Sequence, residues 1–174
     1  MSETPTLTPF AQDDMLAGIG AIAATLQASG WMPDYMVGLG RGGLVPATYL
    51  SHTTGVPMLS LDISAGLPEF SDALIGALAR LSQSGTRLLV VDDINDSGRT
   101  IARLRASLVA AGAVMDRVRF ATLIHNIRST ETVDYHFRQI DRSMVKDWFV
   151  FPWESVAPTT TLIEEAAEVP ERLA

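Results

Sequence analysis

The stretch LLVVDDINDSGRT, at residues 88–100, joins a strand to a turn that is suited to binding phosphate. Residues 88–91 form an apolar run, typical of a buried central strand, and the carboxylates of Asp92 and Asp93 follow at its carboxyl end. The small, hydroxyl-rich segment after them opens a helix, so its backbone N–H groups and the helix dipole form a phosphate cup. The paired acids suit vicinal hydroxyls, or a magnesium ion held with its waters.

A second loop, GLGRGG at residues 38–43, also follows an apolar strand. It matches the dinucleotide-binding pattern G-x-G-x-x-G, and Asp62 lies where that fold keeps its ribose-binding acid. Two features oppose a dinucleotide: a whole helix precedes the glycine strand, and Arg41 stands inside the loop. A bare backbone turn with a guanidinium suits a diphosphate, because arginine presents a rigid fork of donors. A sugar carrying a phosphate, a diol and a diphosphate would satisfy both loops.

Strand and helix patterns alternate along the chain, which predicts an α/β fold with a mostly parallel central sheet flanked by helices. In such a sheet the ligand lies beyond the carboxyl ends of the strands, where both loops are expected. The 133–140 segment alternates apolar and polar residues, as a half-exposed edge strand should. We predict strands at 35–39, 56–63, 87–93, 117–124 and 133–140, and helices at 12–28, from about 43, near 70–81, from about 98 and at 159–169.

Composition narrows the class of protein. The 174 residues carry a net charge of −7 and no cysteine, which excludes disulfides, thiolate catalysis and sulfur-bound metals. Lys146 is the only lysine and no segment clusters basic residues, so we expect no nucleic-acid or membrane partner. The N-terminus lacks the pattern of a signal peptide, which predicts a soluble, cytoplasmic protein. We expect one domain, 1–174, that forms a homodimer or higher homo-oligomer.

Residues 88–100 resemble the signature of the type I phosphoribosyltransferases, and RGGLVPA at 41–47 resembles the pyrophosphate loop of that family. PWE at 152–154, after Trp148, resembles the C-terminal segment of the xanthine-guanine and hypoxanthine-guanine enzymes. The resemblance covers residues 35–154. It implies the type I fold, with a core at about 30–130 and a small C-terminal hood at about 131–157 that the N-terminal segment joins.

The resemblance implies that 5-phosphoribosyl 1-pyrophosphate (PRPP) binds with Mg²⁺ and that a nucleobase displaces its pyrophosphate. Asp96 would be the catalytic residue, accepting the proton from the attacking nitrogen. The residues assigned to PRPP are Asp92, Asp93, Asp96, Ser97, Gly98, Arg99 and Thr100. Those assigned to pyrophosphate are Gly40, Arg41, Gly42 and Gly43. The metal would be held by Asp92, Asp93 and Glu154.

The base site departs from the family pattern. Trp148 would stack on the base and the backbone of Phe149 would meet its edge. Purine enzymes commonly place a lysine near the 6-oxo group, and the alignment puts Asn126 there, with Arg128 as an alternative donor. The mobile loop at 62–72 carries no basic residue and lacks the Ser-Tyr pair of hypoxanthine-guanine enzymes.

Three functions remain open from the sequence. The first is an enzyme that transfers the phosphoribosyl group to a 6-oxopurine such as xanthine, guanine or hypoxanthine in nucleotide salvage. The second is a non-catalytic or regulatory sensor of PRPP, which the missing lysine and the unusual 62–72 loop favour. The third, a nicotinamide or flavin enzyme that uses GLGRGG, is disfavoured by the two features given above.

Overall fold

The computed structural model of the chain describes residues 5–63 and 67–167. Its main feature is a five-stranded sheet in which every pair of neighbouring strands is parallel, with the order β3-β2-β4-β5-β6. The strands are β2 (Tyr35–Leu39), β3 (Met58–Leu61), β4 (Leu88–Asn95), β5 (Val118–Asn126) and β6 (Tyr135–Ile140). The helices are α1 (Gln12–Ala28), α2 (Gly40–Thr54), α3 (Pro68–Gln83), α4 (Arg99–Ala110) and α5 (Thr159–Ala167), with a short 3-10 helix at Met115–Arg117.

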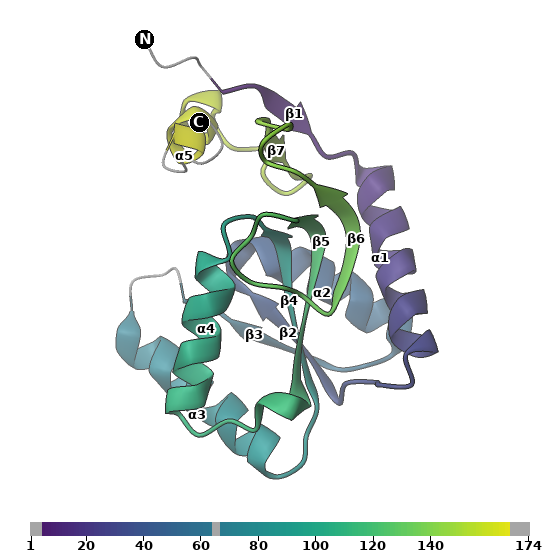
Figure 1. Cartoon of the computed structure of the whole chain (residues 1–174), viewed down its shortest axis with the longest axis vertical. Coiled ribbons are helices and arrows are strands. Elements are labelled where there is room, and N and C mark those ends of the chain that lie inside the picture. The colour runs from purple at the N-terminus through teal and green to yellow at the C-terminus, as the bar shows by residue number, and fades with distance from the viewer. Residues whose placement is uncertain (1–4, 64–66, 168–174) are drawn as a thin grey trace.

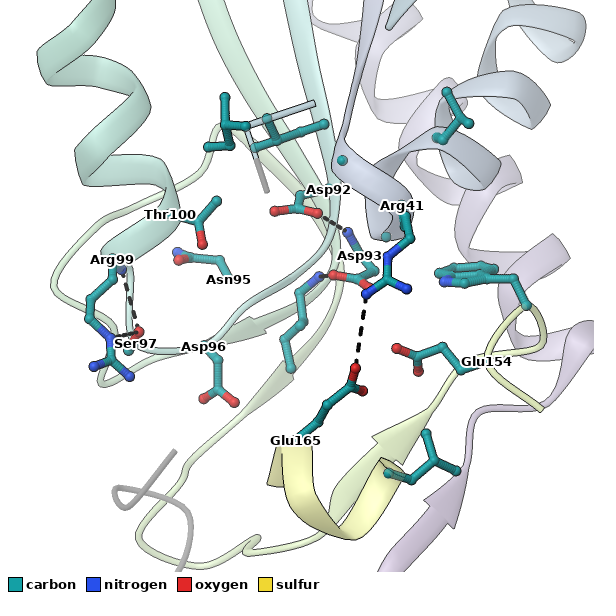
Figure 2. Close-up of a pocket in the computed structure, with 18 of the residues that line it drawn as sticks. Arg41, Asp92, Asp93, Asn95, Asp96, Ser97, Arg99, Thr100, Glu154 and Glu165 are labelled. Atoms are coloured by element: carbon teal, nitrogen blue, oxygen red, sulfur yellow. Dashed lines mark hydrogen bonds and ion pairs between the residues drawn. The ribbon is translucent and has the colours of Figure 1, made fainter. Parts of the chain in front are cut away.

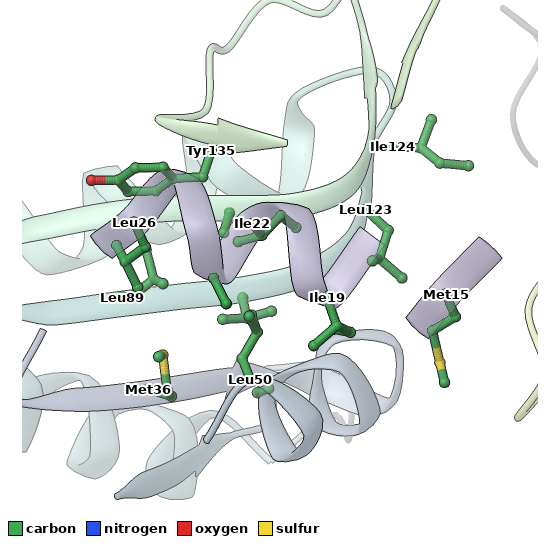
Figure 3. Packing of buried hydrophobic residues seen from close by; sticks show 14 of the residues in the cluster. Met15, Ile19, Ile22, Leu26, Met36, Leu50, Leu89, Leu123, Ile124 and Tyr135 are labelled. Carbon is green, nitrogen blue, oxygen red and sulfur yellow. The ribbon is translucent and has the colours of Figure 1, made fainter. Parts of the chain in front are cut away.

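Strand β4 lies at the centre of the sheet and contributes side chains to both of its faces. Leu89 and Val91 pack in the core that α1 and α2 cover, whereas Leu88 and Val90 pack in the core that α3 and α4 cover. Figure 1 shows the two layers of helices, and Figure 3 shows the α1 side, where Ile19, Ile22 and Leu26 lie against the strands. This burial on both faces explains why the strand is a continuous apolar run.

A second sheet, of two parallel strands, lies apart from the first (Figure 1). It pairs β1 (Leu7–Pro9) with β7 (Trp148–Val150), and Phe10 packs on Phe151 beside it. The sequence did not predict β1, because three residues that include a proline carry no strand pattern. Residues 135–140, which the sequence analysis placed in the hood, pair with β5 at the edge of the main sheet.

The predicted elements agree with the observed ones in type, and the differences lie at their ends. Helix α2 begins at Gly40, three residues before the predicted start at about residue 43. The predicted strand at 56–63 is shorter, at Met58–Leu61. The 62–72 loop and the helix predicted at 159–169 both extend beyond the described residues. In the described part of the chain, no helix is long and apolar enough to cross a bilayer.

The start of α2 touches the central strand directly. A Cβ atom built on Gly43 would stand 2.0 Å from the carbonyl oxygen of Val91 and 3.0 Å from the Cα of Asp92. Backbone atoms cannot move aside as a flexible side chain can, so only glycine permits this approach. The contact brings the loop after β2 against the loop after β4.

We predict that Gly43→Ala destabilises the protein by about 1–3 kcal/mol or more, because the added methyl group overpacks a site walled by backbone. Urea unfolding, followed by circular dichroism, measures the change. Gly20→Ala is the matched control, since Gly20 is exposed on α1 and its Cβ would meet nothing within 4 Å. That variant should be stabilised by up to about 1 kcal/mol. Equal stabilities of the two variants would contradict the close contact.

Candidate active site

The carboxyl ends of β2 and β4 open into a cavity of about 690 Å³. Its walls come from both predicted loops and from the segment that includes Glu154 and helix α5 (Figure 2). The predicted residues that line it are Gly40, Arg41, Gly42, Asp92, Asp93, Asp96, Ser97, Gly98, Arg99, Thr100 and Glu154. Gly43 lies behind this surface, in the contact with β4. Parallel strands thus bring together two loops that are about fifty residues apart in the sequence.

Asp92 and Asp93 form the acidic floor of the cavity. The backbone N–H of Asp93 donates to Oδ1 of Asp92 over 3.0 Å, and that of Ile94 donates to Oδ1 of Asp93 over 2.7 Å. Burial, and then the neighbouring charge of Asp93, raise the pKa of Asp92 well above its usual value. A cation or hydroxyl groups of a ligand would therefore be favourable at this position.

The phosphate loop follows the acids. Gly98 has a φ of 88° and precedes the first residue of α4, a conformation that glycine adopts without strain. Thr130 braces the loop, since its backbone N–H and its hydroxyl both donate to the carbonyl of Ser97, over 3.2 and 2.9 Å. The Ser97 hydroxyl accepts from Arg99 N and Nε, over 3.4 and 3.2 Å. The start of α4 thus has the N-terminal position and small residues that suit a phosphate.

The glycine-rich start of α2 lies directly against the acids. A Cβ on Gly42 would stand 2.3 Å from Oδ2 of Asp93, so this position also has no room for a side chain. The side chain of Arg41 is 87% exposed, and its Nη2 lies 3.9 Å from Oε1 of Glu165 on α5. An exposed pair of this length contributes little to stability, so a diphosphate can replace Glu165 as the partner of Arg41.

The side chain of Asp96 forms a buried ion pair. Its carboxylate is ion-paired with Arg142, with 2.9 Å between Oδ2 and Nη2, and both side chains are buried. Asn126, predicted to meet the base, is also buried and donates its amide N–H to the backbone carbonyl of Asp96 over 3.0 Å. Asn126 therefore supports the predicted catalytic loop from behind, and it is not among the residues that line the cavity.

The hood contributes Glu154 and Trp153 to the cavity wall. Oε2 of Glu154 accepts from the backbone N–H of Phe151 over 2.9 Å, and burial is the main reason that its pKa rises to about 7. Trp153 stacks on Phe151 at a centroid distance of 5.0 Å. Trp148 and Phe149, predicted to bind the base, lie on β7 outside the residues that line the cavity.

The predicted Mg²⁺ ligands have the right chemistry for that ion. Asp92, Asp93 and Glu154 all line the cavity and offer carboxylate oxygens, and the raised pKa values of Asp92 and Glu154 indicate that a cation would stabilise their charged forms. Within residues 5–63 and 67–167, no cluster of three or more acidic or histidine side chains is arranged to enclose a metal. The residues therefore fit an ion held largely by water and by substrate oxygens.

Some residues of the site had no signal in the sequence. Arg142 follows β6 in a polar segment and touches Asp96, which is 46 positions away. Asn95 also supports the loop, since its amide donates to the carbonyl of Glu131 over 2.7 Å and its carbonyl accepts from the Ser129 hydroxyl over 2.9 Å. Such contacts depend on how β5 and β6 end, which no local pattern reports.

A model of the phosphoribosyl transferase domain family matches residues 10–156, which is most of the chain. That range includes both loops and the hood residues up to Glu154. The match therefore covers all of the predicted site residues.

Solved structures share the fold. A purine phosphoribosyltransferase from Pyrococcus horikoshii is 24% identical, with a TM-score of 0.63, over 85% of this chain and 94% of that one. A Neisseria gonorrhoeae protein with bound ppGpp is 21% identical, with a TM-score of 0.67, over 97% and 98%. The xanthine-guanine-hypoxanthine phosphoribosyltransferase of Helicobacter pylori is 19% identical, with a TM-score of 0.60, over 91% and 99%.

We predict that Glu154→Gln raises the melting temperature of the metal-free protein more at pH 8 than at pH 4.5. The folded-state pKa of about 7 lies above the ordinary 4.5, so the folded protein retains this proton. Protonated Glu154 contributes its full stabilisation below pH 4.5, and this stabilisation is lost as the pH rises through 7. Thermal unfolding in EDTA at both pH values measures the effect, and Glu164→Gln, an exposed acid on α5, is the control. A gain that is the same at both pH values would contradict the buried acid.

Proposed function

The chain belongs to the phosphoribosyl transferase family, and we propose that it transfers the 5-phosphoribosyl group of PRPP to a purine base and releases pyrophosphate. One observation carries the proposal: a single cavity is lined by an acidic strand end, a small-residue loop that opens α4, and a glycine-rich segment with an exposed arginine. These match the diol, the 5-phosphate and the diphosphate of one molecule.

Each part of the cavity has a role in binding the sugar diphosphate. Asp92 and Asp93 accept hydrogen bonds from the ribose 2- and 3-hydroxyls. The backbone N–H groups and hydroxyls of residues 97–100 bind the 5-phosphate at the start of α4. Arg41 and the backbone of Gly42 bind the diphosphate, with Glu165 displaced. Asp92, Asp93 and Glu154 would hold Mg²⁺ together with PRPP, and the ion would supply positive charge near the diphosphate.

The reaction exchanges one bond at C1 of the ribose for another. A ring nitrogen of the base forms a bond to C1 while the bond from C1 to the pyrophosphate oxygen breaks. Charge develops on the departing diphosphate, and Arg41 stabilises it electrostatically. Asp96 accepts the proton that the attacking nitrogen loses.

The base is proposed to be a 6-oxopurine such as xanthine, guanine or hypoxanthine. Trp148 and Phe149 would receive it in the hood, as the resemblance to the xanthine-guanine enzymes implies. Asn126, which the alignment assigns to the 6-oxo group, is instead buried behind Asp96 and is left out of this proposal. The Helicobacter pylori neighbour is named for these three bases. An adenine phosphoribosyltransferase from Giardia lamblia, with a TM-score of 0.54, also shares the fold, so adenine belongs in the test.

We predict pyrophosphate release when the protein is given Mg²⁺, PRPP and a 6-oxopurine. A coupled pyrophosphate assay with hypoxanthine, guanine, xanthine, adenine, uracil and orotate measures it, and each mixture without base is the control. Release with a 6-oxopurine supports the proposal. If adenine were the only base that gave release, the proposed 6-oxopurine would be wrong and the proposed transfer reaction would stand. If no base gave release, the proposed enzymatic function would be wrong.

We predict that Arg41→Met raises the KM for PRPP at least about tenfold, because a charge-assisted contact contributes roughly 1.5–3 kcal/mol. The KM for the base should remain within about threefold, since Arg41 lies at the diphosphate end of the cavity. Steady-state kinetics with each substrate varied in turn measure both constants. Arg87→Met, which removes an arginine paired with Asp34 away from the cavity, is the control. If Arg41→Met changed both KM values equally, the placement of Arg41 at the diphosphate end of the cavity would be wrong.

A second candidate is a regulatory protein that binds PRPP or a related nucleotide without transferring it. It is favoured by the Neisseria gonorrhoeae structure with bound ppGpp, which matches nearly the whole chain. A guanosine nucleotide with two diphosphates offers the same anionic groups to Arg41 and to residues 97–100. Calorimetric binding of PRPP or ppGpp, by a protein that releases no pyrophosphate with any base, would favour this function.

A further inference from the structure

The guanidinium of Arg142 hydrogen-bonds both oxygens of the Asp96 carboxylate. Nε of Arg142 lies 2.9 Å from Oδ1 and 3.1 Å from Oδ2, and Nη2 lies 2.9 Å from Oδ2. The side chain of Arg142 is only 4% exposed and that of Asp96 is 10% exposed. Both carboxylate oxygens are therefore engaged by one rigid fork, which fixes the direction of the carboxylate as well as its position.

The other side of the same guanidinium holds the hood. Nη1 donates to the carbonyl oxygens of Val145 and Asp147, over 3.1 and 2.7 Å. Asp147 directly precedes Trp148, the first residue of β7, and Cζ of Arg142 lies 5.3 Å from the centre of the Phe149 ring. One side chain thus joins the loop that carries the predicted catalytic acid to the strand that carries the predicted base-binding residues.

Asn126 completes this arrangement from the end of β5. Its Nδ2 donates to the Asp96 carbonyl over 3.0 Å, and its Oδ1 accepts from the backbone N–H of Arg142 over 3.3 Å. Asn126 therefore holds the backbone of both partners of the ion pair. The side chain that stands where a lysine is expected is engaged in supporting this pair.

Stability alone is a weak reason for such a pair. The cost of removing two charges from water offsets much of their attraction, and apolar replacements of buried pairs are often neutral or stabilising. This pair also lies at the wall of the cavity, since Asp96 is one of its lining residues. Because stability does not explain the pair, its effect on the orientation of a carboxylate in the cavity wall is the property to consider.

We infer that Arg142 is a positioning residue for the transfer reaction, fixing the Asp96 carboxylate relative to the base-binding strand β7. The inference rests on the proposed function. In this arrangement the Asp96 carboxylate keeps one orientation toward the N–H of the incoming base. The bonds from Arg142 to the carbonyls of Val145 and Asp147 hold β7 in a fixed position relative to that carboxylate. Lysine cannot take over this role, because its single ammonium group cannot donate to both Asp96 carboxylate oxygens and to two backbone carbonyls at once.

The test is a double-mutant cycle on kcat, with Arg142→Met, Asp96→Asn and the double variant. If Arg142 acts through Asp96, Arg142→Met lowers kcat at least about thirtyfold in the wild-type background, yet changes it less than about threefold in the Asp96→Asn background. In Arg142→Met the KM for PRPP should stay within about threefold, while the KM for the base rises, because β7 loses its anchor. Arg142→Lys should restore only part of kcat.

A folding check and one control variant keep the test decisive. Arg142→Met leaves a buried carboxylate alone, so circular dichroism and thermal unfolding must show that it folds. If Arg142→Met does not fold, Arg142→Lys replaces it in the wild-type background. The double variant, from which both charges are removed, is then compared with Asp96→Asn. Arg138→Met removes an arginine of β6 that pairs with Asp14 of α1 over 3.1 Å, outside the cavity, and should leave kcat within about threefold.

The outcomes separate this inference from the proposed function. A wild-type protein that transfers to no base in the panel overturns both. An active wild type whose folded Arg142→Met variant retains its kcat overturns the inference alone. Equal losses of kcat in the wild-type and Asp96→Asn backgrounds also overturn it, because a general structural effect would not require Asp96.

Discussion

The site depends on the contact between the start of α2 and the end of β4. Gly43 lies against the Val91 carbonyl and Gly42 lies against the Asp93 carboxylate, at distances that leave no room for a Cβ atom. Because β2 and β4 are parallel neighbours, their carboxyl ends already lie together, and the two glycines allow the loops to touch. The glycine-rich start of α2 and the acidic pair therefore face one cavity, and neither segment alone would form it.

The chemistry of the cavity is divided along its length. Arg41, exposed and only loosely paired with Glu165, is available to an anionic ligand, whereas Asp92 and Glu154 have raised pKa values that favour a nearby cation. At the other end, Asp96 is already fixed by a buried guanidinium. The end that carries Arg41 is thus open to solvent, and the end that carries Asp96 is held by a buried ion pair.

The small sheet is joined to the main one by apolar packing of Phe10 and Phe151 and by polar contacts. Thr8 of β1 donates its hydroxyl to Asp147 over 2.5 Å, and Arg142 binds the carbonyl of the same residue. The hood is therefore tied to the N-terminal strand on one side and to the loop of Asp96 on the other. Substitutions at these positions are expected to change how the base is received while leaving the phosphate loop intact.

The sequence by itself determined the central strand, the two loops that line the cavity and the family, because a buried strand followed by acids and small residues is a local pattern. The α/β class and the parallel sheet were predicted for the same reason, and the structure confirms them. Strand β1 was missed, since its three residues become a strand only by pairing with β7. Only the tertiary structure placed Arg142 on Asp96 and Asn126 behind them, because contacts between residues 30 and 46 positions apart depend on where whole strands end.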